Sequence, residues 1–234
     1  MKLSNRLETI AQMVPETAKD FCVADVGTDH GFVPIWLLTH GRAARALAMD
    51  VRKGPLLRAE EHIQQYGLSD RIETRLSDGL EKLQPGEAQT VVIAGMGGEL
   101  MLRILRDGAH VRESIRHWIL SPQSEPGVFR HGLEELGLAI VKETMLEEEG
   151  KYYTVMLAEP GQMHYEREYQ YQYGACLLKE KSPVLKEFLE REECQYRQIL
   201  DRLDRQQSET AKSRLLEVRR ELAELREALQ ELEE

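Results

Sequence analysis

Apolar runs of strand length alternate with helix-like segments over the first 160 residues. The runs occupy 21–26, 45–51, 72–76, 90–94 and 117–120, and two more follow at 138–145 and 152–158. Segments with helical character separate the early runs, at 32–40, 55–66, 99–106 and 127–135. Strands that alternate with helices form parallel sheets, whereas the acidic turn at 147–150 joins the last two runs directly. The pattern predicts an α/β fold with a Rossmann-like, seven-stranded sheet whose last strand is antiparallel.

Helical patterns of a different kind occupy the two ends of the chain. Residues 1–20 predict an amphipathic helix with Ser4 as its cap and Pro15 as an interruption. Beyond residue 160, β-branched residues become scarce, and Leu or Val recurs at spacings of 3 and 4 from 215 to 232. This coiled-coil seam, an irregular partner helix after Pro183 and a bend at 206–208 with Ser208 as N-cap predict an antiparallel helical hairpin. We therefore expect domains at 1–160 and 161–234.

The turn after the first strand has the composition of a ligand site, because residues 25–31 read Asp-Val-Gly-Thr-Asp-His-Gly. Glycines let a ligand approach the backbone, and the next helix offers its N-terminus. Asp29 stands where a dinucleotide fingerprint has its middle glycine, and its carboxylate would repel a pyrophosphate. This disfavours NAD and FAD and favours a ligand with a cationic part, such as S-adenosylmethionine (SAM). A tight turn without a ligand is the alternative.

Further candidate residues end the next three strands. Asp50 lies about 20 residues beyond the glycine turn, where such folds place the acid that accepts from ribose hydroxyls. Asp78 and Gly79 follow the third strand, where an adenine ring is commonly held; the alternative is that Asp78 caps a helix through Leu83. Three glycines within 95–98 indicate that bulky groups are excluded where substrate meets cofactor, with a structural turn as the alternative.

Composition narrows the class of protein. The 234 residues are 41% hydrophobic, enough for a core, and the net charge of −10 argues against general attraction to nucleic acid without excluding a local basic face. The cysteines at 22, 176 and 194 lie too far apart for a disulfide framework or a zinc site, so we expect no metal. No apolar stretch reaches about 18 residues, which predicts neither export nor a membrane span and places the protein in the cytoplasm.

Several motifs together resemble the bacterial tRNA adenine-22 N1-methyltransferase family, which belongs to the class I SAM-dependent methyltransferases. They are residues 25–31, the segment Ile-Ala-Gly-Met-Gly-Gly at 93–98, Leu-Ser-Asn-Arg-Leu at 3–7 and the helical tail. The resemblance spans essentially the full length. It implies methyl transfer from SAM to N1 of an adenine in the D-arm of tRNA, with the tail helping to hold the tRNA.

The same resemblance implies a set of SAM-binding residues. They are Asp25, Gly27, Thr28, Asp29, His30, Gly31, Asp50, Val51, Asp78, Gly79, Gly95, Met96 and Gly97. Adenine N1 attacks through an in-plane lone pair, so alignment is the main task of the enzyme. A carboxylate is needed only if N6 releases a proton. Asp29 is the candidate for that step, and its alternative role is to contact the ammonium group or backbone of SAM.

An RNA substrate also needs groups that bind phosphate. We expect an RNA track beside the mouth of the site, with Arg6 on the first helix as a further candidate; the track consists of Arg103, Arg106, Arg112 and Arg116. Solvated surface arginines are the alternative. Two other functions stay open, namely a SAM-dependent methyltransferase of another substrate and a non-catalytic protein that binds SAM or RNA. No obligate protein partner is indicated.

Overall fold

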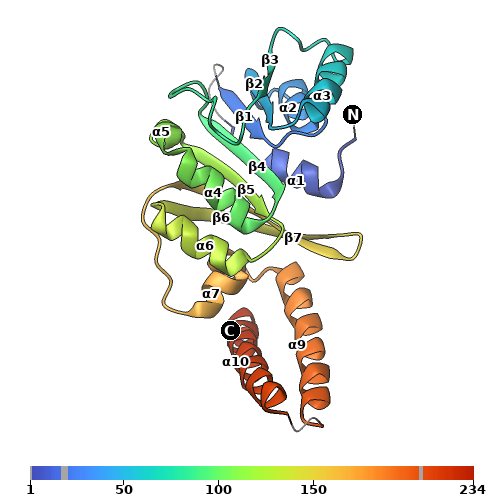
Figure 1. Ribbon diagram of the computed structural model, residues 1–234, viewed down its shortest axis with the longest axis vertical. Coiled ribbons are helices and arrows are strands. Elements are labelled where there is room, and N and C mark those ends of the chain that lie inside the picture. The colour runs from blue at the N-terminus through green and yellow to red at the C-terminus, as the bar shows by residue number, and fades with distance from the viewer. Residues whose placement is uncertain (1, 17–20, 206–207) are drawn as a thin grey trace. The chain divides into compact units, whose positions relative to one another are not determined.

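The computed structural model describes residues 2–16, 21–205 and 208–234 (Figure 1). The chain forms two compact units, Met1–Met163 and His164–Glu234. The boundary expected from composition lay slightly earlier, after residue 160. Two residues of the expected bend, Gln206 and Gln207, lie outside the described residues.

The first unit is built on a seven-stranded sheet with the order β3-β2-β1-β4-β5-β7-β6. The strands are β1 (Cys22–Val26), β2 (Arg45–Asp50), β3 (Ile72–Leu76), β4 (Thr90–Met96), β5 (His117–Pro122), β6 (Leu138–Glu148) and β7 (Lys151–Pro160). The first five strands are parallel to one another, whereas β7 pairs antiparallel with both β5 and β6. This arrangement confirms the predicted sheet.

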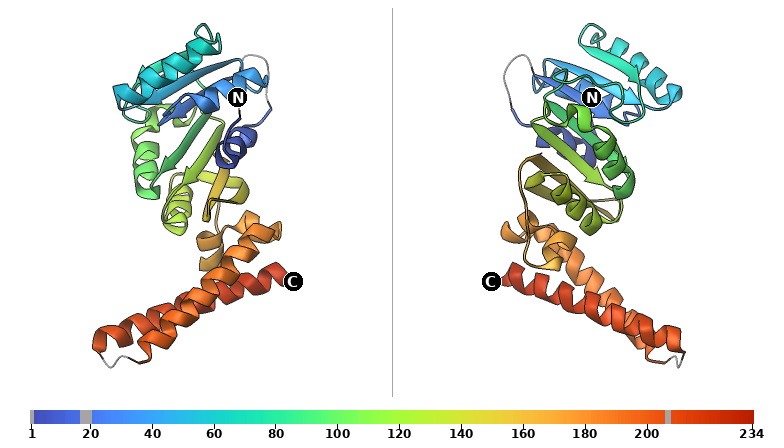
Figure 2. Two further views of the ribbon diagram at one scale, coloured as in Figure 1. Left: turned by 90° about the vertical axis from the view of Figure 1, so that its right-hand side faces the viewer. Right: turned by 60° about the vertical axis from the view of Figure 1, so that its left-hand side comes forward.

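Six helices flank this sheet. They are α1 (Asn5–Met13), α2 (Phe32–Thr39), α3 (Lys53–Gln65), α4 (Gly98–Asp107), α5 (Ala109–Arg112) and α6 (Pro126–Glu135). Right-handed crossovers carry α2 and α3 in one direction along the sheet and α4 in the other, so they cover opposite faces. Helix α1 packs on α2, and α4 packs on α6; Figure 2 shows α1 and α4 on opposite sides of the sheet. Where the strand order reverses, between β1 and β4, the carboxyl ends leave a crevice.

Local interactions explain where several elements begin and end. The Ser4 hydroxyl accepts from the Leu7 N–H at 3.3 Å, which confirms Ser4 as the N-cap of α1. The β6–β7 hairpin continues to a two-residue turn at Glu149 and Gly150, both with positive φ, and the pair of strands is therefore longer than expected (Figure 1).

The segment after β3 forms turns, so the alternative that Asp78 caps a helix is wrong. The Ser77 hydroxyl donates to the Gly79 carbonyl at 3.0 Å and accepts from the Lys82 N–H at 3.1 Å. Gly79 has a φ of +55°, in the left-handed region, which stops a right-handed helix from starting.

The second unit consists of α7 (Glu168–Tyr173), α8 (Ala175–Lys179), α9 (Pro183–Leu203) and α10 (Glu209–Glu233). The long helices α9 and α10 lie side by side in opposite directions (Figures 1 and 2). Ion pairs join them at three levels, Lys186–Glu233, Glu193–Arg226 and Asp204–Arg219. The Ser208 hydroxyl accepts from the Ala211 N–H, which confirms it as an N-cap. Helices α7 and α8 were not predicted, because they are too short to show a clear hydrophobic period.

In the ranges that the structure describes, no helix has both the length and the apolar character that a bilayer crossing requires.

A buried ion pair lies under α6 in the first unit. The Arg130 guanidinium donates to one Glu143 oxygen through Nε at 2.9 Å and through Nη2 at 2.7 Å. The two side chains are 1% and 0% exposed. Such a pair is costly to bury but far more costly to break, because one charge is then left without compensation.

We expect Arg130→Met to lower the free energy of unfolding of this unit by about 3–5 kcal/mol. Urea unfolding followed by tryptophan fluorescence measures it, because Trp36 and Trp118 are both buried in this unit. The double variant Arg130→Met/Glu143→Leu removes both charges and should recover most of the loss. Equal stability of Arg130→Met and the unmodified protein would show that the pair carries no such role.

Candidate active site at the carboxyl edge of the sheet

A cavity of about 390 Å³ opens at the carboxyl ends of β1 and β4. It brings together residues from five separate segments of the first unit. They are Arg6 and Leu7 of α1; Asp25, Gly27, Thr28, Asp29, His30, Phe32 and Val33 around the first turn; and Arg52, Val92, Ala94, Gly95 and Gln123 from the neighbouring strands and their ends. Six of the expected SAM-binding residues therefore line one cavity.

The turn between β1 and α2 is held by the neighbouring strand β2. The N–H groups of Gly27 and Thr28 donate to the Met49 carbonyl at 2.8 and 3.0 Å. Gly27 has a φ of +83°, and a Cβ there would lie 2.1 Å from the terminal methyl of Met96. Glycine thus permits both the backbone turn and the close approach of Met96. Gly31 lies just outside the cavity lining and begins α2 in the left-handed conformation.

Asp25 is a buried carboxyl group beneath this turn. Burial raises its pKa most, a hydrogen bond from Thr28 lowers it and the nearby charge of Asp50 raises it, which together bring the pKa to about 6. Among the described residues, no Lys or Arg contributes to its titration. A carboxylate that lacks a cationic partner and lines a cavity suits a ligand that carries positive charge.

Asp29 has a different environment from Asp25. Its side chain is 59% exposed, accepts a hydrogen bond from Arg58 of α3 and lies 3.3 Å from His30 Nε2. The hydrogen bond from Arg58 lowers its pKa. Asp29 is thus anionic at neutral pH and a weaker base than an ordinary aspartate.

An aromatic cluster forms the wall next to Asp29. The rings of His30 and Phe32 stack at a centroid distance of 5.0 Å, and Phe32 stacks on His62 of α3 at 4.9 Å. Within the described ranges, the buried Nδ1 of His30 has no hydrogen-bond partner. His30 and Phe32 thus present stacked rings to the cavity, and one ring nitrogen of His30 is unsatisfied.

Asp50 and Val51 lie beside the cavity but outside its lining. Asp50 is 7% exposed, and its carboxylate accepts from the Arg52 N–H at 2.7 Å. Val51 is exposed. Arg52 lines the cavity and reaches within 3.7 Å of the Asp50 carboxylate. Arg52 belongs to a cluster of basic residues at 42–58 in the sequence, but it was not among the expected cofactor-binding residues.

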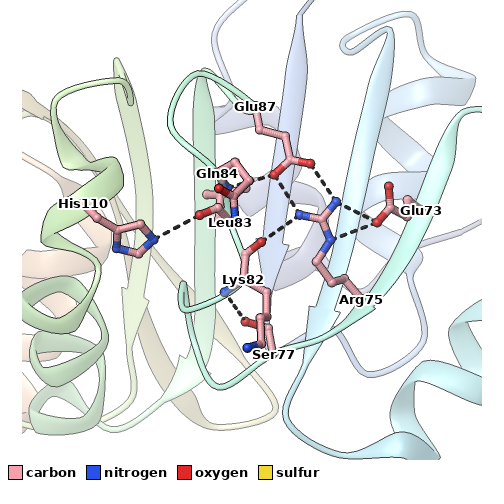
Figure 3. A network of polar contacts seen from close by, with 8 residues as sticks. All are labelled: Glu73, Arg75, Ser77, Lys82, Leu83, Gln84, Glu87 and His110. Atoms are coloured by element: carbon pink, nitrogen blue, oxygen red, sulfur yellow. Dashed lines mark hydrogen bonds and ion pairs between the residues drawn. The ribbon is translucent and has the colours of Figure 1, made fainter.

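A network of polar contacts fixes the loop that follows β3 and carries Asp78 and Gly79 (Figure 3). Arg75 of β3 donates to Glu73, to Glu87 and to the Lys82 carbonyl, while His110 contacts the Leu83 carbonyl at 3.0 Å. Asp78 itself is exposed, and its carboxylate lies 3.7 Å from Arg103 Nη2. Asp78 and Gly79 share the carboxyl edge of the sheet with the cavity without lining it.

Three glycines lie at the end of β4 and the start of α4, and each is required for a different structural reason. Gly95 lines the cavity with a φ of +80°. A Cβ at Gly97 would lie 3.2 Å from the Ser124 hydroxyl oxygen, and one at Gly98 only 2.7 Å from the Ser124 carbonyl oxygen. Gly98 therefore lets α4 pack against the loop after β5, which is a structural requirement.

The expected RNA track is wrong in its location for two arginines. Arg116 precedes β5 and Arg112 ends α5, so both lie toward the amino edge of the parallel strands, away from the cavity. Arg112 also donates to the Leu105 carbonyl at 2.8 Å. Arg103 and Arg106, on α4, are exposed and approach Asp78 and Glu135.

Arg6 lines the cavity rather than projecting into solvent, and Gln123 lies beside it. Sequence reasoning missed Gln123. The available signal was a polar residue immediately after a parallel strand, the position at which open α/β sheets place functional side chains.

Comparisons with known proteins agree with this geometry. Residues 3–156 match the model of a methyltransferase domain family. The sheet order, the antiparallel β7 and this match therefore define a Rossmann-like methyltransferase.

More specific similarity comes from individual relatives. The tRNA (adenine(22)-N(1))-methyltransferase of Bacillus subtilis is 37% identical over 161 residues, 69% of this chain and 66% of that enzyme. The crystal structure of the B. subtilis m1A22 tRNA methyltransferase TrmK matches with a TM-score of 0.85 and 31% identity, covering 97% of this chain and 99% of that one. A Streptococcus pneumoniae protein assigned as a tRNA (m1A22) methyltransferase, solved with S-adenosyl-L-methionine, matches with a TM-score of 0.86 and 30% identity over 97% and 100%. The chain belongs to the TrmK-like family of tRNA m1A22 methyltransferases.

We expect the Asp25 carboxyl to titrate near pH 6 in the ligand-free protein, as 13C NMR of aspartate-labelled protein would measure. Thr28→Val removes a hydrogen bond to the charged form, so the pKa should rise above 6. In the unmodified protein the pKa of Asp25 is higher in the folded state than in the unfolded chain. The contribution of this group to stability therefore falls as the pH rises from about 4 to about 6. Thr39→Val, remote from Asp25, is the matched control. A titration near pH 4 would contradict the assignment.

Proposed function

We propose that the protein methylates N1 of the adenine at position 22 of tRNA, with SAM as methyl donor. The observation that carries the proposal is the similarity to B. subtilis TrmK, which extends over 97% of this chain and so includes the helical unit as well as the methyltransferase unit. A similarity limited to the sheet would support methyl transfer without indicating the substrate.

The proposed donor site occupies the first-turn side of the cavity. Asp25, Gly27, Thr28, Asp29, His30 and Gly31 would hold the methionine part of SAM, with Asp50 and Val51 at the ribose, Asp78 and Gly79 at the adenine, and Gly95, Met96 and Gly97 near the transferred group. The chemistry of this set fits a cationic ligand, since two carboxylates meet at one turn and Asp25 has no cationic partner among the described residues.

Bound SAM supplies a methyl group on a positively charged sulfur, which passes to N1 and leaves S-adenosylhomocysteine. The N1–carbon bond forms as the carbon–sulfur bond breaks, and the positive charge moves from sulfur to the adenine ring. Fixed anionic side chains stabilise the charge before and after transfer, so the residues mainly align the reactants and exclude water. Transfer requires no proton to move.

Of the two roles that the sequence left open for Asp29, we assign it the electrostatic one, contact with the cationic donor, and not proton acceptance. Its hydrogen bond from Arg58 lowers its pKa, which keeps the carboxylate charged and makes it a weak base. A permanent negative charge beside the cavity suits both the ammonium group of the donor and the methylated adenine.

We further propose that the helical unit helps to hold the tRNA in the cytoplasm, where the substrate is found. The unit separates its charges along its length. Residues 195–220, around the bend, contain seven Lys or Arg residues against four Asp or Glu residues, although the whole chain carries −10. A local excess of positive charge binds phosphates even on an acidic protein.

Methylation of an unmodified tRNA transcript tests the proposed reaction directly. With radiolabelled SAM and a transcript that has adenine at position 22, we expect label in 1-methyladenosine after nucleoside digestion. A matched transcript with guanine at position 22 should acquire none, because guanine N1 carries a proton and has no free lone pair. Label in another nucleoside would point to a different substrate, and no label in any tRNA would refute the proposal.

Charge reversal near the bend tests the role of the helical unit. Arg202 and Arg205 are exposed, so Arg202→Glu/Arg205→Glu should fold normally and bind SAM as before. We expect KM for tRNA to rise about tenfold or more. The slope of log affinity for tRNA against log salt concentration should become shallower by about two, because two phosphate contacts are lost. Lys179→Glu/Lys181→Glu, exposed positions of the same unit away from the bend, is the charge-matched control. An equal KM in both variants would argue against a specific role for the bend.

A further inference from the structure

One side of the cavity is formed by a hydrogen-bond network around Gln123, a residue that the proposed donor site does not include. Gln123 directly follows β5, and its backbone N–H donates to the Met96 carbonyl at 2.9 Å. Its side-chain amide, oriented to satisfy both neighbours, donates to the Gly95 carbonyl at 3.2 Å and accepts from Arg6 Nη1 at 3.2 Å. Arg6, Gly95 and Gln123 all line the cavity.

Arg6 is itself held in place by the β6–β7 hairpin. Its guanidinium carbon lies 5.0 Å from the centre of the Tyr153 ring, and its backbone N–H donates to Glu148 at 3.3 Å. An arginine carries only donors, so its position fixes which end of the Gln123 amide is the oxygen. By holding Arg6, the hairpin acts together with the Gly95 carbonyl to set the orientation of the Gln123 amide.

The Gln123 amide has hydrogen-bonding capacity to spare. A primary amide has two N–H donors and an oxygen with two lone pairs. Gly95 takes one donor and Arg6 takes one lone pair. Among the described residues, one donor and one acceptor of this exposed side chain therefore stay available at the cavity.

The methylated base presents a matching pair of groups on an edge that leaves N1 free. Methylation at N1 requires that its lone pair receive no hydrogen bond, so recognition must use other atoms. The Hoogsteen edge of adenine offers the N6–H donor and the N7 acceptor, and a glutamine amide pairs with both. Guanine presents two acceptors, O6 and N7, and would place O6 against the amide oxygen.

We propose that Gln123 recognises the target adenine through N6 and N7, and that Arg6 is a positioning residue that sets the orientation of the amide. This inference rests on the proposed function, since it concerns the base that enters the same site. It gives Arg6 a role in base selection in addition to any contact with RNA phosphates.

The test uses full-length tRNA assembled by ligation with either adenosine or 7-deazaadenosine at position 22. The analogue keeps N1 and N6 but has C–H in place of N7. We expect the unmodified protein to lose about tenfold in kcat/KM on the analogue, the effect of one hydrogen bond with its partner left unpaired. Gln123→Ala should be slower on adenosine and should treat the two RNAs alike within about twofold. Gln12→Ala, an exposed glutamine on α1, is the matched control and should discriminate like the unmodified protein.

The positioning role of Arg6 has a separate readout. Arg6→Met should reduce the discrimination between adenosine and 7-deazaadenosine, while Arg6→Lys, which keeps a donor, should restore part of it. Calorimetry should give the same SAM affinity for the unmodified protein and these variants. A loss of SAM binding in Gln123→Ala would assign the residue to the donor site and overturn the inference.

The outcomes separate this inference from the proposed function. Failure to methylate either RNA would refute the function itself. Efficient methylation of both RNAs by the unmodified protein, with equal kcat/KM, would leave the function standing and refute recognition through N7. Discrimination that persists in Gln123→Ala would likewise refute it.

Discussion

A buried carboxyl group at the end of the first strand is the constraint on which the site depends. Asp25 lies between β2 and β4 at the reversal of the strand order, where α/β sheets open into a crevice. Burial and the neighbouring Asp50 make its charge costly, and one hydrogen bond from Thr28 offsets only part of that cost. A cationic ligand in the cavity would stabilise the charged form. Asp29, which is exposed and accepts a hydrogen bond from Arg58, places a second negative charge beside the cavity.

The cavity joins two parts of the first unit that differ in origin. The turn between β1 and α2 arises from adjacent sequence, whereas the side formed by Arg6, Gly95 and Gln123 is assembled from α1, β4 and β5. The long β6–β7 hairpin contributes through Tyr153 and Glu148, which hold Arg6. This division fits the two proposals, in which the turn motif would bind the common donor and the side assembled by the tertiary fold would bind the particular acceptor.

Local patterns in the sequence were sufficient for most of the fold. Alternating apolar runs and glycine turns predicted the seven strands, and the spacing from 215 to 232 predicted the helical pair, because these features depend on neighbours in sequence. The loop after β3 was read partly as a helix because the Ser77 and Arg75 contacts that shape it are not visible in a linear pattern. The helices α7 and α8 were missed because they are too short to show a period. The positions of Arg112 and Arg116 were wrong because the number of residues from a glycine motif does not tell at which edge of a sheet a residue lies. Gln123 and the pairing of Asp29 with Arg58 depend on contacts between distant segments and could not be predicted.

We propose that Asp25, a buried and largely uncompensated carboxyl group where the strand order reverses, binds a positively charged methyl donor. Titration calorimetry of the purified protein with SAM at pH 5 and at pH 7 tests it most directly. If SAM binds only to the ionised form of Asp25, whose pKa is about 6, its affinity should be about tenfold higher at pH 7 than at pH 5, and binding at pH 6 should release about half a proton per bound SAM. Asp25→Asn should abolish this pH dependence. The absence of any SAM uptake, or an affinity that is the same at both pH values, would contradict the account.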